Sequence, residues 1–179
     1  MKYPSFLKKG DTIGVLATSC GSNVNPYRIK TMQALKNLEK LGYKIKKGHR
    51  IYRNTNAVSA PHDIRAKDFM SFYKNKNINV LWSTGGGELL MGMLPYIDFE
   101  KISKLTFTLT TKCDVATLYA CNITSFSYDT LHIDTLDTLS LLTNNKLSFD
   151  SYPFYQGLTK PSNPLEFIDY VEEVKWLSI

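Results

Sequence analysis

Short apolar runs alternate with longer amphipathic runs through the first half of the chain. Residues 11–18 (DTIGVLAT) are apolar enough to form a strand that is buried on both faces. After a polar turn, Asn25 is expected to cap a helix whose first position is Pro26. Gly42 should end this helix, and apolar residues at helical spacing predict its buried face: Ile29, Met32, Leu35, Leu38 and Leu41.

The same alternation continues to a third strand. Residues 43–47 alternate Tyr and Ile with Lys, which is typical of a strand near the edge of a sheet. A second helix is expected from about Ala60, and residues 78–83 should form the third strand. The inward face of the second helix is predicted to hold Ile64, Phe69, Phe72 and Tyr73. Strands and helices that alternate over such short connections predict an α/β fold with a doubly wound, mostly parallel sheet.

Three consecutive glycines, residues 85–87, follow the third strand. A buried strand that enters a glycine turn and then a helix brings backbone N–H groups close to a bound oxyanion, and the helix dipole favours negative charge there. The apolar segment after the turn should stop near Pro95. The same glycines also fit a connection that serves packing alone. The candidate binding residues at this turn are Thr84, Gly86, Gly87 and Glu88.

A second candidate site follows a fourth predicted strand, residues 105–110 (LTFTLT). Cys113 and Asp114 come shortly after this strand, just before a helical run. A strand, a sharp turn and a helix place the side chain at the turn above the sheet, which is the arrangement of a nucleophile elbow. The alternative interpretation is a small buried thiol that packs the turn, because free Cys is among the most buried residue types.

Composition indicates an ordinary globular protein. The 179 residues are 43% hydrophobic and 21% charged, which suits one α/β domain but not two full ones. No apolar run approaches the ~18 residues of a membrane span, and residues 1–12 lack the apolar core of a signal peptide, so we expect a cytoplasmic protein with no membrane partner. Three cysteines without a CxxC spacing predict reduced thiols, with no disulfide framework, metal site or cofactor.

Charge is distributed unevenly along the chain. Residues 1–87 carry 16 Lys and Arg against 4 Asp and Glu, whereas residues 88–179 carry 6 against 12. The lysines fall at outer positions of a predicted helix and strand, and no nucleic-acid-binding motif accompanies them. A solvated face therefore explains the basic half better than a nucleic-acid surface. The acidic half is expected to favour a basic partner surface, for example on a second copy of this chain.

Five short motifs in a fixed order resemble the LD-carboxypeptidase family, the serine carboxypeptidases that include the microcin C immunity peptidases. The resemblance covers about residues 6–128 and implies a Rossmann-like N-terminal domain, similar to that of class I glutamine amidotransferases. Several matches in register are far more specific than a single glycine motif. The motifs are KKGDTI (residues 8–13), LEKLGY (38–43), RAKD (65–68), TGGG (84–87) and LPYIDF (94–99).

The resemblance implies a role for each candidate residue. Cys113 stands where the family has its nucleophilic serine, and the glycine of the family's elbow is missing before it. The resemblance implies that the backbone N–H of Asp114 and that of Gly86 or Gly87 hold the oxyanion. The implied substrate is a small peptide, such as a muropeptide or a peptide-nucleotide. Residues 89–92 are apolar where relatives carry polar residues and an Arg, so this wall of the site has changed.

The chain ends before the family's second domain, which supplies the catalytic Glu and His. Residues 1–130 are expected to form the LD-carboxypeptidase-like α/β domain with the C-terminal domain missing, and residues 131–179 a tail or truncated linker. The tail should contain an amphipathic stretch, an aromatic segment and a final acidic helix over residues 164–177. None of the three histidines matches the catalytic one: His49, His62 and His132.

Three functional hypotheses remain open at this point. The first is a hydrolase with Cys113 as nucleophile, and the second is an inactive remnant that binds a peptide or a partner. The third is a cysteine hydrolase that has recruited His132 or His62 as its base. An uncovered domain face also predicts association. The partner would be either a second copy of this chain, which gives a homodimer, or a separately encoded C-terminal half. The residues expected to be exposed on that face are Leu89, Leu90, Met91 and Met93, with Tyr152, Phe154 and Tyr155 of the tail.

Overall fold

A three-stranded parallel sheet forms the centre of the molecule. The computed structural model describes residues 6–85, 88–99, 123–131, 133–143, 154–156 and 170–173. Strands β1 (Thr12–Leu16), β2 (Lys44–Lys47) and β3 (Val80–Ser83) lie in the order β2-β1-β3. Both pairs are parallel, so the predicted α/β fold and the edge position of the lysine-rich strand are confirmed. The predicted fourth strand, residues 105–110, lies outside the described residues.

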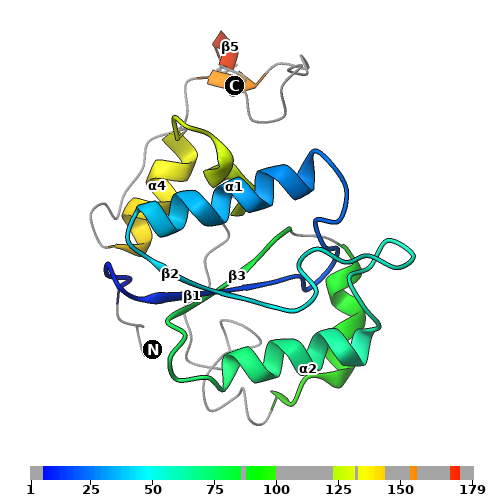
Figure 1. Cartoon of the computed structure of the whole chain (residues 1–179). Helices are drawn as coiled ribbons and strands as arrows, with labels where there is room; N and C mark the ends of the chain where they lie inside the picture. The colour runs from blue at the N-terminus through cyan, green and yellow to red at the C-terminus, as the bar shows by residue number, and fades with distance from the viewer. Residues whose placement is uncertain are drawn as a thin grey trace, which may run out of the picture.

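Two helices cover opposite faces of this sheet (Figure 1). Helix α1 (Tyr27–Lys40) lies on one face and α2 (His62–Tyr73) on the other. The short 3₁₀ helix η2 (Ile123–Ser127) packs along α1, and α4 (Ile133–Leu142) lies on the same side of the sheet. The sheet is therefore doubly wound, as predicted from the alternation of strands and helices.

The two ends of α1 differ in how well the sequence predicted them. The helix begins after Pro26 with no side-chain cap, so the prediction that Asn25 caps it is wrong. At the other end, the Tyr43 N–H donates to the Leu38 carbonyl (3.2 Å) and the Gly42 N–H to the Glu39 carbonyl (3.0 Å). Together with a φ of 98° at Gly42, these bonds form a Schellman motif, so the predicted stop is confirmed.

The buried face of α1 is rotated from the predicted stripe. Met32 is 45% exposed, which contradicts its prediction as an inward residue. Thr31 is fully buried instead, because its hydroxyl donates to Ser22 Oγ (2.7 Å) in the loop before the helix. The hydrogen bond satisfies a polar group that periodicity alone places outside. Thr31 shares the buried face with Ala34, Leu35 and Leu38.

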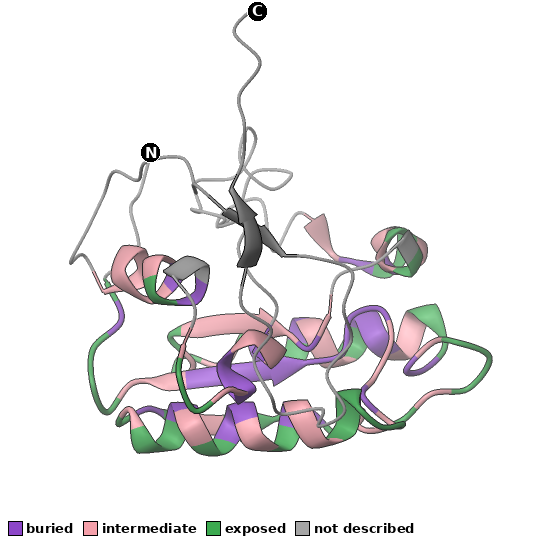
Figure 2. Ribbon diagram, turned by 90° about the horizontal axis from the view of Figure 1, so that it is seen from above, coloured by how far each residue is buried: buried purple, intermediate pink, exposed green. Residues whose placement is uncertain are grey.

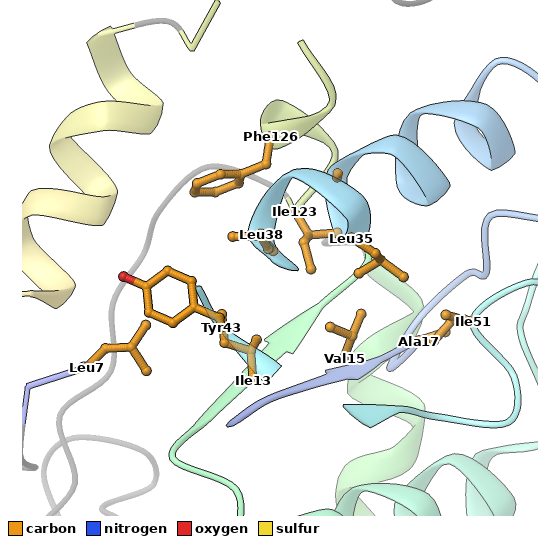
Figure 3. Packing of buried hydrophobic residues seen from close by; sticks show 11 residues of the cluster. Leu7, Ile13, Val15, Ala17, Leu35, Leu38, Tyr43, Ile51, Ile123 and Phe126 are labelled. Atoms are coloured by element: carbon orange, nitrogen blue, oxygen red, sulfur yellow. The ribbon is translucent and has the colours of Figure 1, made fainter. Parts of the chain in front are cut away.

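The main apolar core lies between the sheet and α1 (Figure 3). Figure 2 shows that the central strand is almost wholly buried, and Ile13 and Val15 of β1 are 0% exposed. Leu35 and Leu38 point down from the helix, and Ile123 and Phe126 close the core from η2. The Phe126 ring packs edge-on against Trp82 of β3, with 5.2 Å between ring centroids. This core packs the sheet against α1 and so fixes where its strand ends lie.

The segment after the glycines is a helix, as expected there, and it is of the 3₁₀ type. This helix, η1 (Glu88–Tyr96), contains Pro95, so it does stop at the predicted place. Its apolar side packs on α2, where Met93 and Ile97 meet Ala66 and Met70. Met93 is only 3% exposed, which contradicts its assignment to an exposed patch, whereas Leu89 and Met91 are 40% and 66% exposed.

The last third of the chain is described only in part. The amphipathic stretch predicted around Leu139 is the helix α4. Strand β4 (Phe154–Gln156) pairs antiparallel with β5 (Tyr170–Glu173), so the final acidic helix predicted over residues 164–177 is wrong at β5. Tyr170 and Val171 have high strand propensity, which outweighs the helical charge pattern there. In the parts of the chain that are described, no helix is long and apolar enough to cross a membrane.

Candidate functional site

The carboxyl ends of β1 and β3 form one edge of the sheet and are joined across it. The Thr84 N–H donates to the Leu16 carbonyl (2.8 Å), which extends the pairing one step beyond β3. Thr84 Oγ1 also donates to the Cys20 carbonyl (3.3 Å) in the loop after β1. The chain leaves β1 toward α1 on one face of the sheet and reaches β3 from α2 on the other. Crevices at such points are where open α/β sheets bind ligands.

A line of hydroxyl groups fixes the entry to the glycine turn. Ser83 Oγ donates to the Gly85 carbonyl (2.6 Å) and lies 2.9 Å from Thr18 Oγ1. Because a serine has one hydroxyl hydrogen, the Thr18 hydroxyl must be the donor between the two. The three groups form a chain of hydrogen bonds from the end of β1 to the first turn glycine. Gly85 is thus held in place by side chains before the turn begins.

Among the described residues, space is left open beside Gly85. A Cβ built on this residue would lie 4.0 Å from Cys20 Sγ, an ordinary van der Waals distance, and no other described residue beyond its chain neighbours would lie nearer. The half-buried thiol of Cys20 thus lies beside the first glycine of the turn. Sequence reasoning treated Cys20 as one thiol among three. Its place in the polar turn after the first strand is the signal that could have identified it.

The loop after β1 is locked by the loop after β2. The Gly21 N–H donates to Asn54 Oδ1 (2.5 Å), and Asn54 Nδ2 donates back to the Gly21 carbonyl (2.9 Å). Ser59 Oγ donates to the Ala17 carbonyl (2.6 Å), and the Ser59 N–H donates to the Ser19 carbonyl (3.0 Å). Neither Asn54 nor Ser59 was identified from the sequence, since both lie in a stretch that only resembles a polar loop.

A buried arginine stands behind this edge. Arg65 of α2 is 1% exposed, and its guanidinium donates to the carbonyls of Ala60 (2.9 Å), Thr18 and Leu89 (2.9 Å). Its Nη2 also contacts His62 Nδ1. Burial lowers the pKa of the Arg65 guanidinium from its ordinary value, because desolvation disfavours the charged form. Arg65 belongs to the RAKD motif noted above, but no pattern in the sequence indicates that it is buried at the sheet edge.

The structure places only some of the predicted site residues. Thr84 lies at the sheet edge as expected and is buried, and Glu88 begins η1. The remaining four candidates lie outside the described residues: Gly86, Gly87, Cys113 and Asp114. His62 lies at this edge with its Nδ1 engaged by Arg65, whereas His132 is not described. Within the described residues, no group of three His, Cys, Asp or Glu side chains is placed to hold a metal ion.

A cavity of about 440 Å³ lies away from this edge, at the amino ends of the strands. The segment before β1, the end of α1 and α4 line it, through Leu7, Lys8, Lys9, Leu41, Tyr43, Leu139 and Thr143. It shares no lining residue with the carboxyl edge. The candidate site therefore rests on backbone geometry at the carboxyl edge, and not on this cavity.

Comparison with known proteins gives three concordant results. A model of the LD-carboxypeptidase N-terminal domain matches residues 13–132. The chain is 28% identical over 120 residues to the putative carboxypeptidase YocD of Bacillus subtilis (strain 168), covering 67% of this chain and 36% of that protein. The match to the family model thus begins within β1 and extends past Cys113.

Solved structures with the same fold are longer than this chain. An MccF-like protein from Bacillus anthracis str. Ames superposes with a TM-score of 0.70 at 24% identity, over 80% of this chain and 47% of its own. The Microcin C7 self immunity protein MccF in complex with aspartyl sulfamoyl adenosine superposes with a TM-score of 0.67 at 19% identity, over 96% and 56%. The chain thus spans about half the length of these proteins, and their likeness shows the fold.

Proposed function

This chain belongs to the LD-carboxypeptidase family, and on that premise we propose that it forms the ligand-binding, nucleophile-bearing part of a hydrolase that cleaves an amide bond in muropeptides or peptide-nucleotides. The observation that carries the proposal is the fixed entry to the glycine turn. Thr84 and Gly85 are hydrogen-bonded to the loop after β1, at the edge of the sheet where open α/β proteins bind ligands. Two MccF-type neighbours hold aspartyl sulfamoyl adenosine and AMP, which are the first compounds to test.

The proposed chemistry starts at Cys113, at the position of the family's serine. Its thiolate attacks the carbonyl carbon of the scissile amide, and the tetrahedral oxyanion accepts hydrogen bonds from the N–H of Asp114 and of Gly86 or Gly87. Collapse breaks the C–N bond and leaves a thioester on Cys113, provided that an acid protonates the departing nitrogen. Water then hydrolyses the thioester, which returns the thiol and releases the carboxylic acid.

We further propose that these 179 residues alone do not complete this cycle. A positioned general acid and base contribute typically 10²–10⁴-fold to such a reaction, and no histidine here matches the family's catalytic one. The family's Glu and His come from a second domain, and this chain spans about half the length of its neighbours. The chain should therefore bind and react at Cys113 without steady-state product release. We place this activity in the cytoplasm, where the cysteines stay reduced.

The test compares binding, labelling and turnover in one set of variants. Aspartyl sulfamoyl adenosine is titrated by calorimetry, and an LD-muropeptide is followed by intact mass and product release. We expect binding, faster alkylation of Cys113 than of Cys20 or Cys121, and no steady-state product. Cys113→Ser restores the family's residue and should keep binding while the fast labelling is lost.

Two results would overturn these proposals in different ways. If neither aspartyl sulfamoyl adenosine, AMP nor the muropeptide binds, the ligand site itself is wrong. Turnover that disappears in Cys113→Ala but survives both His132→Ala and His62→Ala would show that the chain contains a base of its own. Both outcomes are measured against the same wild-type preparation.

A second candidate function is an inactive member that binds a peptide or partner. The observation in its favour is the exposed apolar surface next to the site, where Leu89 and Met91 of η1 face outward. An uncovered surface of this kind favours association, either with a second copy or with a separately encoded C-terminal half. Light scattering at high concentration should show association that Met91→Lys reduces. A monomer at all concentrations would contradict it.

A further inference from the structure

Arg65 joins three segments that are far apart in the sequence. Its Nε donates to the Ala60 carbonyl just before α2, and its Nη1 donates both to the Thr18 carbonyl after β1 and to the Leu89 carbonyl in η1. The residue is separated from Thr18 by 47 positions and from Leu89 by 24. One nitrogen with two hydrogens therefore connects the end of β1 to the first turn of η1.

A charge in this position is costly and needs a reason. Arg65 is 1% exposed, and the partners that the structure gives it among the described residues are carbonyls and His62, not a carboxylate. Taking a guanidinium out of water is expensive unless good hydrogen bonds replace its hydration. The carbonyl oxygens supply that replacement only while all three segments stay in place. The planar, rigid fork of arginine suits such a task, whereas the ammonium of lysine is a point charge.

We propose that Arg65 is a positioning residue for the ligand site, which sets the distance between the end of β1 and η1. Gly85 enters the glycine turn and Glu88 leaves it. Gly85 is tied to β1 through Ser83 and Thr18, so fixing Leu89 against Thr18 fixes the other end of the turn. The opening that a ligand meets is then set by Arg65, which touches no ligand itself. The claim that Arg65 positions a ligand site rests on the proposed function. The claim that Arg65 sets the spacing between β1 and η1 does not depend on that function.

The test replaces two arginines in turn, one within α2 and one that contacts α2 from the loop after β2. Arg65→Lys keeps the charge but cannot reach both Thr18 and Leu89 through one planar group. The matched control is Arg50→Lys, because Arg50 is half-buried and contacts α2 through Asp68 (2.6 Å) but forms no bond to Thr84 or Gly85, the described start of the turn. Three readouts are taken at a temperature where both variants are folded: alkylation of Cys20 by peptide mapping, hydrogen exchange of residues 84–93, and the Kd of aspartyl sulfamoyl adenosine.

We expect Arg65→Lys to raise Cys20 alkylation and exchange in residues 84–93 by about tenfold and to weaken the Kd by a similar factor, as expected for loss of a charged hydrogen bond. Arg50→Lys should change each by less than about twofold. Equal effects of the two variants would overturn the proposal. So would an Arg65→Lys variant that lowers Tm but changes alkylation, exchange and Kd no more than Arg50→Lys does. A wild-type chain that binds no ligand would refute the proposed function, while alkylation and exchange still decide the role of Arg65.

A second measurement needs no variant and covers the case in which Arg65→Lys does not fold. If Arg65 couples the segments, residues 18–21 and residues 88–93 of the wild-type chain should open together in native-state hydrogen exchange, with one shared dependence on denaturant. Independent opening of the two segments, with different dependences, would contradict the coupling.

Discussion

The two edges of the sheet are held together in different ways. At the carboxyl edge, side chains from distant segments bond to the backbone, through Arg65, Asn54 and Ser59. At the amino edge, the described residues form mainly backbone pairs, such as the Leu7 N–H to the Leu142 carbonyl (2.8 Å), and apolar contacts around the cavity. A side-chain bond there, from the Thr12 N–H to Asn79 Oδ1 (2.9 Å), is exposed.

This difference distinguishes the candidate ligand site at the carboxyl edge from an amino edge that serves packing. Buried polar side chains stabilise a fold less than apolar ones of similar size, so their concentration at one edge indicates that the backbone there must adopt a fixed shape. The amino edge can tolerate adjustment because apolar contacts are not directional. We therefore expect substitutions at the amino edge to change stability alone, and those at the carboxyl edge to change stability and ligand binding together.

The largest effect is expected at the amino end of the core, from Leu38→Ala. Leu38 is 0% exposed in the last turn of α1, and its truncation leaves a cavity that should cost about 3–4 kcal/mol of unfolding free energy. Denaturant unfolding measures this loss. The Kd of aspartyl sulfamoyl adenosine should stay unchanged in the folded fraction; a weaker Kd would show that the two edges are not separate.

The next effect tests two glycines at the carboxyl edge. A Cβ on Gly21 would lie 2.3 Å from the Arg53 carbonyl oxygen, whereas one on Gly85 would meet, in the described part of the chain, Cys20 Sγ alone at 4.0 Å. Gly21→Ala should therefore cost about 2–3 kcal/mol through backbone displacement, and Gly85→Ala less than about 1 kcal/mol. Thermal unfolding compares them. Equal losses would mean that the loop after β1 gives way easily.

A smaller loss is expected when the clamp on that loop is removed. Asn54→Ala leaves both backbone groups of Gly21 without their side-chain partner and should cost about 2 kcal/mol. The control Asn75→Ala loses one exposed bond to the Asn77 N–H, so it should cost less than about 0.5 kcal/mol. Asn54→Ala should also weaken ligand binding, and unchanged binding would limit Asn54 to a structural role.

The smallest effect concerns alkaline pH. Burial, and then the nearby Asp11 carboxylate, raise the pKa of Tyr43 above its ordinary value of 10.0. Since the unfolded chain releases this proton first, the contribution of Tyr43 is complete below pH 10 and is lost as the pH rises through its folded pKa. Tyr43→Phe should flatten the decline of Tm above pH 10. An identical decline in both proteins would assign the loss to other groups, such as Tyr52, whose pKa burial also raises.

The sequence predicted local features well where one short segment decides them. Periodicity predicts the three strands and the two helices that connect them, and one glycine predicts the stop at Gly42. The prediction failed where a distant contact outweighed it. Met32 is exposed, and Thr31 is buried through its hydrogen bond to Ser22 Oγ. Met93, which the sequence predicts to be exposed, is buried because it packs on α2.

The sequence by itself determined the parallel sheet, its lysine-rich edge and the position of the glycine turn after β3. These depend on residue spacing within a few turns of chain, where hydrophobic periodicity acts directly on the backbone. Only the tertiary structure decided how the carboxyl edge is held, because Asn54 reaches Gly21 across 33 positions and Arg65 reaches Thr18 across 47. No local pattern encodes such bonds. They form only after the core has brought the loops together and excluded the water that would otherwise satisfy the same groups.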